Sequence, residues 1–101
     1  MTIKPLPHTF EVYIPVARAR PEHKQRVVDC HGGLTIQHSI GLWRVPYEGN
    51  VIEEPVYIYR WSCGDYAEGN HTCTMLAQEL LDAGEEAVFF TYNGQAFIKE
   101  Q

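Results

Sequence analysis

The hydrophobic pattern near the beginning of the chain is typical of a β-strand. In residues 8–16, HTFEVYIPV, apolar side chains alternate with other side chains. The apolar positions are Phe10, Val12, Ile14 and Val16, and Glu11 and Tyr13 lie between them. Because successive side chains of a strand point to opposite faces of its sheet, we expect the four apolar residues to face the core.

A helix is predicted to follow. Pro21 suits the first turn of a helix, and Glu22 complements the partial positive charge at its N-terminus. His23, Val27 and Cys30 then recur at helical spacing. Gly32 and Gly33 are expected to end this helix.

Two longer strands are predicted next, at residues 34–44 and 51–61. The connecting segment VPYEGN has Glu48-Gly49-Asn50 as its turn. In the first of these strands the even positions are mostly aliphatic: Leu34, Ile36, His38, Ile40 and Leu42. Pro55 lacks an N–H group, so it predicts an edge position or a bulge in the second strand.

The strand at 51–61 has two different apolar sides. One side carries Ile52, Val56 and Ile58, and the other carries Glu53, Tyr57, Tyr59 and Trp61. We expect the aliphatic side to lie under helices and the aromatic side to stay uncovered.

The C-terminal part predicts a helix and a hairpin. Residues 62–70 suggest a loop, with Asn70 as the N-cap of a helix that ends at Gly84. AVFFTY is a strand, and Asn93-Gly94 favours a tight turn into a short last strand, QAFIK.

The order of these elements is β-α-β-β-α-β with one added C-terminal strand. This order predicts an α+β fold of the ferredoxin-like type, with both helices on one face of an antiparallel sheet. The other face would then expose Tyr13, Trp43, Tyr57, Tyr59 and Trp61. An exposed apolar patch of that size indicates an interface, and we expect self-association to cover it.

Length and composition narrow the possible functions. With 101 residues the chain is predicted to be a single domain, 1–101. Its net charge of -5 and scattered basic residues argue against a nucleic-acid partner. No apolar run is long enough to span a membrane or to act as a signal peptide, so a cytoplasmic location is expected. The three cysteines form no CxxC pair and are expected to be reduced.

Metal binding is weakly indicated, because neither His71-x-Cys73 nor Cys30-His31 has a structural-zinc spacing. Both cysteines fit helix-core positions instead, and no metal is expected.

Glu53 and Glu54 form a more informative pair. In the simplest interpretation Pro55 breaks the alternation, and both glutamates are solvated at a strand end. In the functional interpretation one of them lies at the edge of a cleft between subunits, beside Trp43 and Tyr47. A carboxylate next to aromatic faces suits a cationic ligand such as an ammonium, guanidinium or sulfonium.

The arrangement GLW(x)5GN(x)3E followed by a strand resembles CutA and the PII signalling proteins, which are ferredoxin-like trimers with ligand sites between subunits. A narrower resemblance is to the phage-encoded enzymes that degrade S-adenosylmethionine. It is carried by PHTFEVYIPVARAR, by the glutamate pair at the start of the third strand, and by LAQELLDAGEEAVFFTYNG. These segments cover most of the chain.

The narrower resemblance implies a trimeric S-adenosylmethionine lyase that forms methylthioadenosine and homoserine lactone without a cofactor. Its key glutamate would be Glu54, with Glu53 as the second choice. The aromatic partner on the second strand would be Trp43, where relatives are expected to have a tyrosine, and Tyr47 is the candidate to supply the missing hydroxyl. The implied substrate-binding set is Trp43, Tyr47, Glu53, Tyr57 and Arg20.

In the implied reaction, the carboxylate of the substrate attacks its own γ-carbon, so positioning supplies much of the rate. A phage origin would place the enzyme in the host cytoplasm, where it would counter restriction-modification. The alternative function is that of a non-catalytic trimer, similar to PII or CutA, that binds a nucleotide or metabolite.

Overall fold

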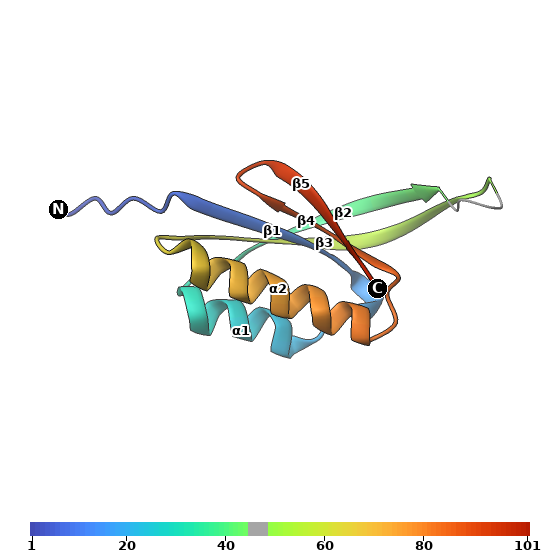
Figure 1. Cartoon of the computed structure of the whole chain (residues 1–101), viewed down its shortest axis with the longest axis horizontal. Coiled ribbons are helices and arrows are strands. Elements are labelled where there is room, and N and C mark those ends of the chain that lie inside the picture. Colours follow the sequence, from blue (N-terminus) through green and yellow to red (C-terminus); the bar gives the residue numbers. More distant parts are fainter. Residues whose placement is uncertain (45–48) are drawn as a thin grey trace.

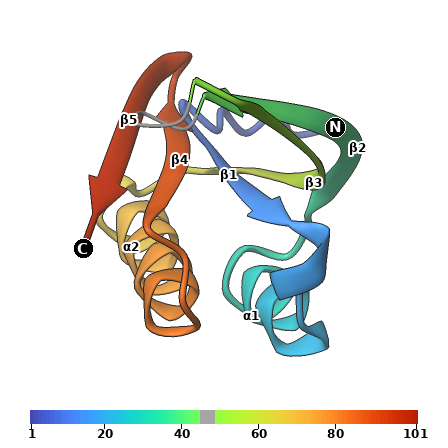
Figure 2. The ribbon, with the colours of Figure 1, turned by 90° about the vertical axis from the view of Figure 1, so that its right-hand side faces the viewer.

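The computed structural model describes residues 1–44 and 49–101. The elements are β1 (His8–Pro15), a 3-10 turn (Val16–Arg18), α1 (Pro21–His31), β2 (Thr35–Arg44), β3 (Val51–Cys63), α2 (Tyr66–Asp82), β4 (Ala87–Tyr92) and β5 (Gln95–Glu100). The strands form one antiparallel sheet in the order β2-β3-β1-β4-β5. Both helices lie on the same side of this sheet (Figures 1 and 2). The predicted α+β, ferredoxin-like fold with an extra C-terminal strand is confirmed.

The core lies between the helices and one face of β1, β3 and β4, which we call the helix face. On β1 this face carries Phe10, Val12 and Ile14, all buried as expected. The opposite side of the sheet is the open face. No helix of the described residues is long and apolar enough to cross a membrane.

The prediction for the third strand was wrong. In the β1–β3 register, Phe10 pairs with Trp61 and Val12 pairs with Tyr59. Directly opposed residues share a face, so these two aromatic residues lie under the helices, where each is only 2% exposed. Tyr57 lies on the same face, opposite Ile14. Aromatic rings have the largest apolar area to bury, and this strand places them in the core.

The aliphatic side of β3 therefore lies on the open face. Val56 and Ile58 share that face with Tyr13, which is opposite Ile58. The open face thus keeps only Tyr13 and Trp43 of the five aromatic residues that we expected there.

Pro55 lies in an uninterrupted strand. It is opposite Ile40 of β2, and the pairing of β3 with β1 ends one residue later, at Val56. At Pro55 the strand therefore has no neighbour on its β1 side, which is where a residue without an N–H group is tolerated. The predicted local edge is present, and the alternation of faces continues through it.

The second helix begins earlier than predicted. Its N-cap is Asp65, whose Oδ1 accepts a hydrogen bond from the Ala67 backbone N–H at 3.0 Å, and not Asn70. Gly69 looked like a loop residue, but it lies in the first turns of α2. A Cβ there would be 2.3 Å from the Phe10 ring and 2.6 Å from the Cys63 sulfur. The glycine therefore permits close packing of the helix on the sheet.

The β2–β3 hairpin extends well past the helices (Figure 1). The molecule measures 55 × 25 × 24 Å. On the helix side the outer half of this hairpin exposes Ile40, Leu42 and Val51, and on the open side it exposes Trp43 and Ile52. The even positions of β2 lie on the helix side of the sheet, but these outer ones lie beyond the reach of the helices.

Candidate functional site

The structure brings Trp43 and Glu54 together. The Trp43 indole Nε1 donates a hydrogen bond of 2.8 Å to Glu54 Oε1. The two residues are 11 positions apart in the sequence and meet because β2 and β3 are antiparallel neighbours, with Glu54 opposite Gly41. Both side chains lie on the open face, in the outer half of the hairpin.

Gly41 creates the space for this contact. A Cβ at this position would lie 3.1 Å from Trp43 Nε1 and 3.3 Å from two carbons of the indole. The indole therefore lies close over the glycine backbone, with its N–H directed to the carboxylate. Sequence analysis missed this role of Gly41. The available signal was a glycine two residues before an aromatic in a strand, which often marks a close approach.

Glu53 and Glu54 leave β3 on opposite faces. Glu53 is opposite Leu42 and lies on the helix side, and Glu54 lies on the side of Val56 and Ile58. Simple alternation along the strand places Glu54 with these two residues, and the register agrees. This aliphatic side was expected under the helices but lies on the open face, so the carboxylate escapes the desolvation that burial there would impose.

The remaining predicted site residues lie apart from the Trp43–Glu54 pair within one chain. Tyr57 is on the helix side of the sheet, opposite His38, and the two rings meet edge to face at 4.9 Å. Arg20 is the N-cap of α1 and borders the same cavity as Tyr57. Tyr47 lies outside the described residues.

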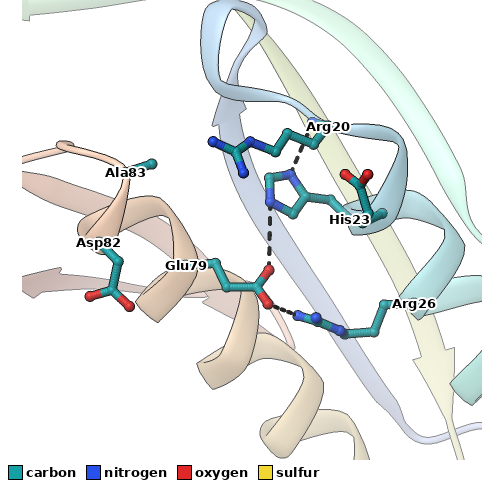
Figure 3. Close-up of a pocket in the computed structure, with 7 residues that line it drawn as sticks. Arg20, His23, Arg26, Glu79, Asp82 and Ala83 are labelled. Atoms are coloured by element: carbon teal, nitrogen blue, oxygen red, sulfur yellow. Dashed lines mark hydrogen bonds and ion pairs between the residues drawn. The ribbon is translucent and has the colours of Figure 1, made fainter.

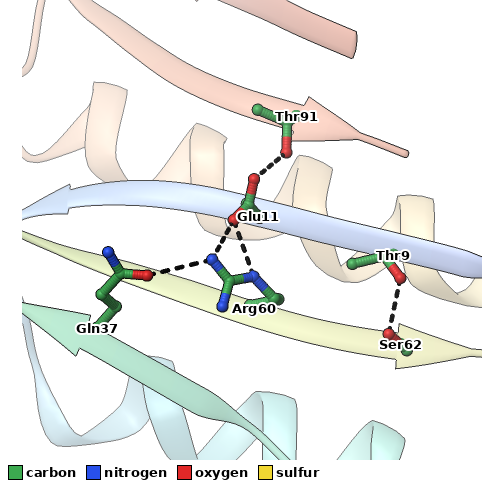
Figure 4. Close-up of polar contacts among 6 residues, drawn as sticks. All are labelled: Thr9, Glu11, Gln37, Arg60, Ser62 and Thr91. Atoms are coloured by element: carbon green, nitrogen blue, oxygen red, sulfur yellow. Dashed lines mark hydrogen bonds and ion pairs between the residues drawn. The ribbon is translucent and has the colours of Figure 1, made fainter. Parts of the chain in front are cut away.

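A polar network occupies the middle of the open face (Figure 4). Glu11 Oε2 accepts hydrogen bonds from Arg60 Nε at 2.9 Å and from its terminal nitrogen at 2.6 Å, and Glu11 Oε1 accepts one of 2.7 Å from the Thr91 hydroxyl. Arg60 also donates to Gln37 at 3.2 Å. Burial alone raises the pKa of Glu11, but the hydrogen bonds from Thr91 and Arg60 together outweigh it, so that its pKa is below the ordinary value of 4.5.

A second cluster of charges joins the two helices (Figure 3). His23 Nε2 lies 3.5 Å from Glu79 of α2, which also forms an ion pair with Arg26. The His23 Nδ1 accepts a hydrogen bond of 3.2 Å from the Arg20 backbone N–H. Burial lowers the pKa of His23, although the Glu79 charge opposes this change. The imidazole therefore serves as a neutral link between the helices.

The chemistry available at Trp43 and Glu54 is recognition of a cation. The indole N–H occupies one carboxylate oxygen and fixes the orientation of the group, while Glu54 keeps its negative charge for another partner. Trp43 is 39% exposed, so part of its side chain is accessible beside that charge. A carboxylate and an aromatic face together attract an ammonium or sulfonium group.

Comparison with known proteins adds a fold relationship. No family model matches the sequence, and no curated protein matches it. Among solved structures, the chain is similar to a phage SAM lyase in complex with S-methyl-5'-thioadenosine, with a TM-score of 0.73 and 10% sequence identity. The match covers 100% of this chain and 95% of that one. Over its whole length, this protein therefore has the fold of a phage S-adenosylmethionine lyase.

Proposed function

We propose that this protein is an S-adenosylmethionine lyase in which Glu54 and Trp43 bind the cationic part of the substrate. The observation that carries the proposal is the 2.8 Å hydrogen bond between these residues, which presents a carboxylate and an aromatic face together on the open face. The fold shared with a phage SAM lyase supports it. The amino-acid resemblance described above points to the same glutamate.

The proposed reaction is an intramolecular displacement. A carboxylate oxygen of the substrate forms a bond to the γ-carbon, and the bond from that carbon to sulfur breaks. The electron pair of the broken bond goes to sulfur, giving neutral S-methyl-5'-thioadenosine, and the closed ring is L-homoserine lactone. No proton transfer or cofactor is needed. Opposite charges combine in the transition state, so a site with little water favours it.

In this mechanism Glu54 acts by position and charge. Its carboxylate holds the sulfonium or ammonium end, and the Trp43 indole packs against the bound cation. Trp43 has no hydroxyl, so the mechanism assigns none to it. Holding the substrate chain folded brings its carboxylate to the γ-carbon, and such orientation is worth an effective molarity on the order of 10⁵ M or more.

We propose that the active protein is a homotrimer with sites between subunits. The support is the β2–β3 hairpin, whose outer half exposes apolar side chains on both faces. A neighbouring copy that covers this hairpin would also cover Trp43 and Glu54 and exclude water from them. The side chains that would form the contacts between subunits are then Ile40, Leu42, Val51 and Ile52. The Tyr59 and Trp61 side chains lie under the helices and would not take part.

The test is to incubate purified protein with S-adenosylmethionine and to separate the products by chromatography. The proposal expects S-methyl-5'-thioadenosine and homoserine lactone in equal amounts. Tight binding with the ligand recovered unchanged would instead favour the non-catalytic trimer. If neither binding nor product is seen at high protein concentration, the proposal is wrong.

As a lyase, the protein would remove the methyl donor and cofactor on which restriction-modification depends. We propose this role in the cytoplasm of an infected host. The corresponding measurement is the intracellular level of S-adenosylmethionine after expression of the protein, compared with expression of Glu54→Gln.

A further inference from the structure

A cavity of about 310 Å³ lies on the helix side of the sheet, away from the Trp43–Glu54 pair. Its floor is formed by two directly opposed pairs of β2 and β3: Ile36 with Tyr59 and His38 with Tyr57. Its wall is the start of α1 with the segment before it: Val16, Ala19, Arg20, Pro21 and Lys24. The volume is at the lower end of the range for small-molecule sites.

The charges around this cavity are unusual for an acidic protein. The chain has a net charge of -5. Even so, the described residues that line the cavity include Arg20, Lys24 and His38 and no carboxylate. Neither Arg20 nor Lys24 takes part in an ion pair among the described residues. The lining therefore favours an anion.

Arg20, the N-cap of α1, also borders a second cavity, between α1 and α2, which is drawn in Figure 3. There its guanidinium extends toward α2. The helix dipole itself adds little to anion binding, because Glu22 in the first turn carries a negative charge and His23 Nδ1 accepts a hydrogen bond from the Arg20 backbone N–H.

Tyr59 supplies an independent observation. Its side chain is 98% buried, since the residue is only 2% exposed, yet it lines the cavity. Its hydroxyl forms no hydrogen bond with any residue that the structure describes. The hydroxyl is not among the buried polar atoms that lack a partner, so it keeps contact with solvent at the cavity and is free to donate to a ligand. Burial, with the nearby Tyr57 as a smaller cause, raises the pKa of Tyr59, so the hydroxyl keeps its proton and can donate it.

We propose that this cavity binds a small organic phosphate, with the phosphate between Lys24, His38 and the Tyr59 hydroxyl and the organic part against the apolar and tyrosine walls. A phosphate monoester carries about -1.5 to -2 charges at neutral pH, which matches the positive charges of Lys24 and Arg20. It also offers more acceptor atoms than a carboxylate. Within one chain this cavity is separate from the Trp43–Glu54 pair, because it is on the other side of the sheet.

The test uses calorimetric titration of the full chain with phenyl phosphate, inorganic phosphate and phenol. Phenyl phosphate is expected to bind most tightly, inorganic phosphate more weakly, and phenol not measurably. Lys24→Gln is expected to weaken the binding of phenyl phosphate about tenfold. Tyr59→Phe is expected to weaken it by a similar factor, since each substitution removes one hydrogen bond to a charged group. If inorganic phosphate binds as tightly as phenyl phosphate, the aromatic walls do not contribute to binding, and that part of the proposal is wrong.

Lys4→Gln is the matched control, because it removes the same charge from the exposed N-terminal segment. Equal weakening by Lys4→Gln and Lys24→Gln, or no binding of phenyl phosphate, would overturn the proposal. Far-UV circular dichroism checks that each variant is folded. Cleavage of S-adenosylmethionine by Lys24→Gln is expected to be unchanged, so failure of this site and failure of the proposed lyase function give different results.

Discussion

The two halves of the β2–β3 hairpin differ in how far they are covered: β3 is largely buried in the inner half, whereas both strands are largely exposed in the outer half. In the inner half, Tyr59 and Trp61 are each 2% exposed and pack with the helices. In the outer half, Leu42 is 64% exposed and Ile52 is 51% exposed. The helices pack against β1, β3 and β4, and β1 pairs with β3 only as far as Val56. The outer half therefore has neither a third strand nor a helix.

This difference separates what stabilises the chain from what can bind a ligand. A two-stranded hairpin is marginally stable alone in water, so the outer half gains little stability from contacts within this chain. The Trp43–Glu54 pair lies in that half. We infer that the inner half maintains the fold and that the outer half serves assembly and chemistry.

The largest expected effect is in the inner region. Phe10 is 1% exposed and its ring stacks with Trp61 at 5.7 Å. Phe10→Ala is expected to lower the free energy of unfolding by about 3–5 kcal/mol, because it removes buried area and leaves a cavity. Urea denaturation at fixed protein concentration measures this. Ile3→Ala, in the exposed N-terminal segment, is the control. It is expected to change the free energy of unfolding by less than about 0.5 kcal/mol.

Glu54→Gln is expected to reduce kcat/KM for S-adenosylmethionine about a hundredfold, the order of magnitude for losing one electrostatic contact in an active site. The free energy of unfolding should change by less than about 0.5 kcal/mol, since the side chain is at the surface. Steady-state kinetics and urea denaturation give the two values. Glu53→Gln is the matched control, because that side chain leaves β3 on the other face. Loss of activity in Glu53→Gln alone would reverse the assignment of the two glutamates.

A smaller effect is expected at Gly41. In Gly41→Ala the new Cβ would lie 3.1 Å from Trp43 Nε1, so the indole must shift and its hydrogen bond to Glu54 weakens. A displacement of this kind is expected to lower kcat about tenfold. Thermal unfolding should show an intact fold. Gly64→Ala is the control, because nothing lies within 4 Å of a Cβ there. Equal kinetics for the two variants would show that the indole is not held as we describe.

The smallest effect on the folding of one chain is expected at the end of the hairpin. Leu42→Ser should change the free energy of unfolding of the isolated chain by less than about 0.5 kcal/mol, because Leu42 makes little contact within it. The same change is expected to shift the protein from trimer toward monomer in a sedimentation experiment. A trimer as stable as the original would contradict the proposed role of the outer half in assembly.

Several features could be read from the sequence because they depend on local chemistry. The alternation in residues 8–16 identified β1 and its core face, and Pro21 and Gly32 bounded α1. Asn93 and Gly94 both have positive φ, as the predicted turn requires. The separation of Glu53 and Glu54 onto opposite faces also followed from the period of two.

Other features were decided by tertiary structure. Residues 51–61 are apolar on both sides, so their pattern fits either orientation, and only the pairing of Phe10 with Trp61 places the aromatic rings under the helices. In the sequence Gly69 resembled a loop residue. In the structure it lies in α2, where the Phe10 ring leaves no room for a Cβ. Trp43 meets Glu54 through the register of two strands, and a register depends on the whole sheet. The sequence by itself determined the elements and their order, because these follow from local periodicity. Which face of the sheet the helices cover, and which distant side chains meet, both depend on long-range contacts. Only the tertiary structure therefore decided them.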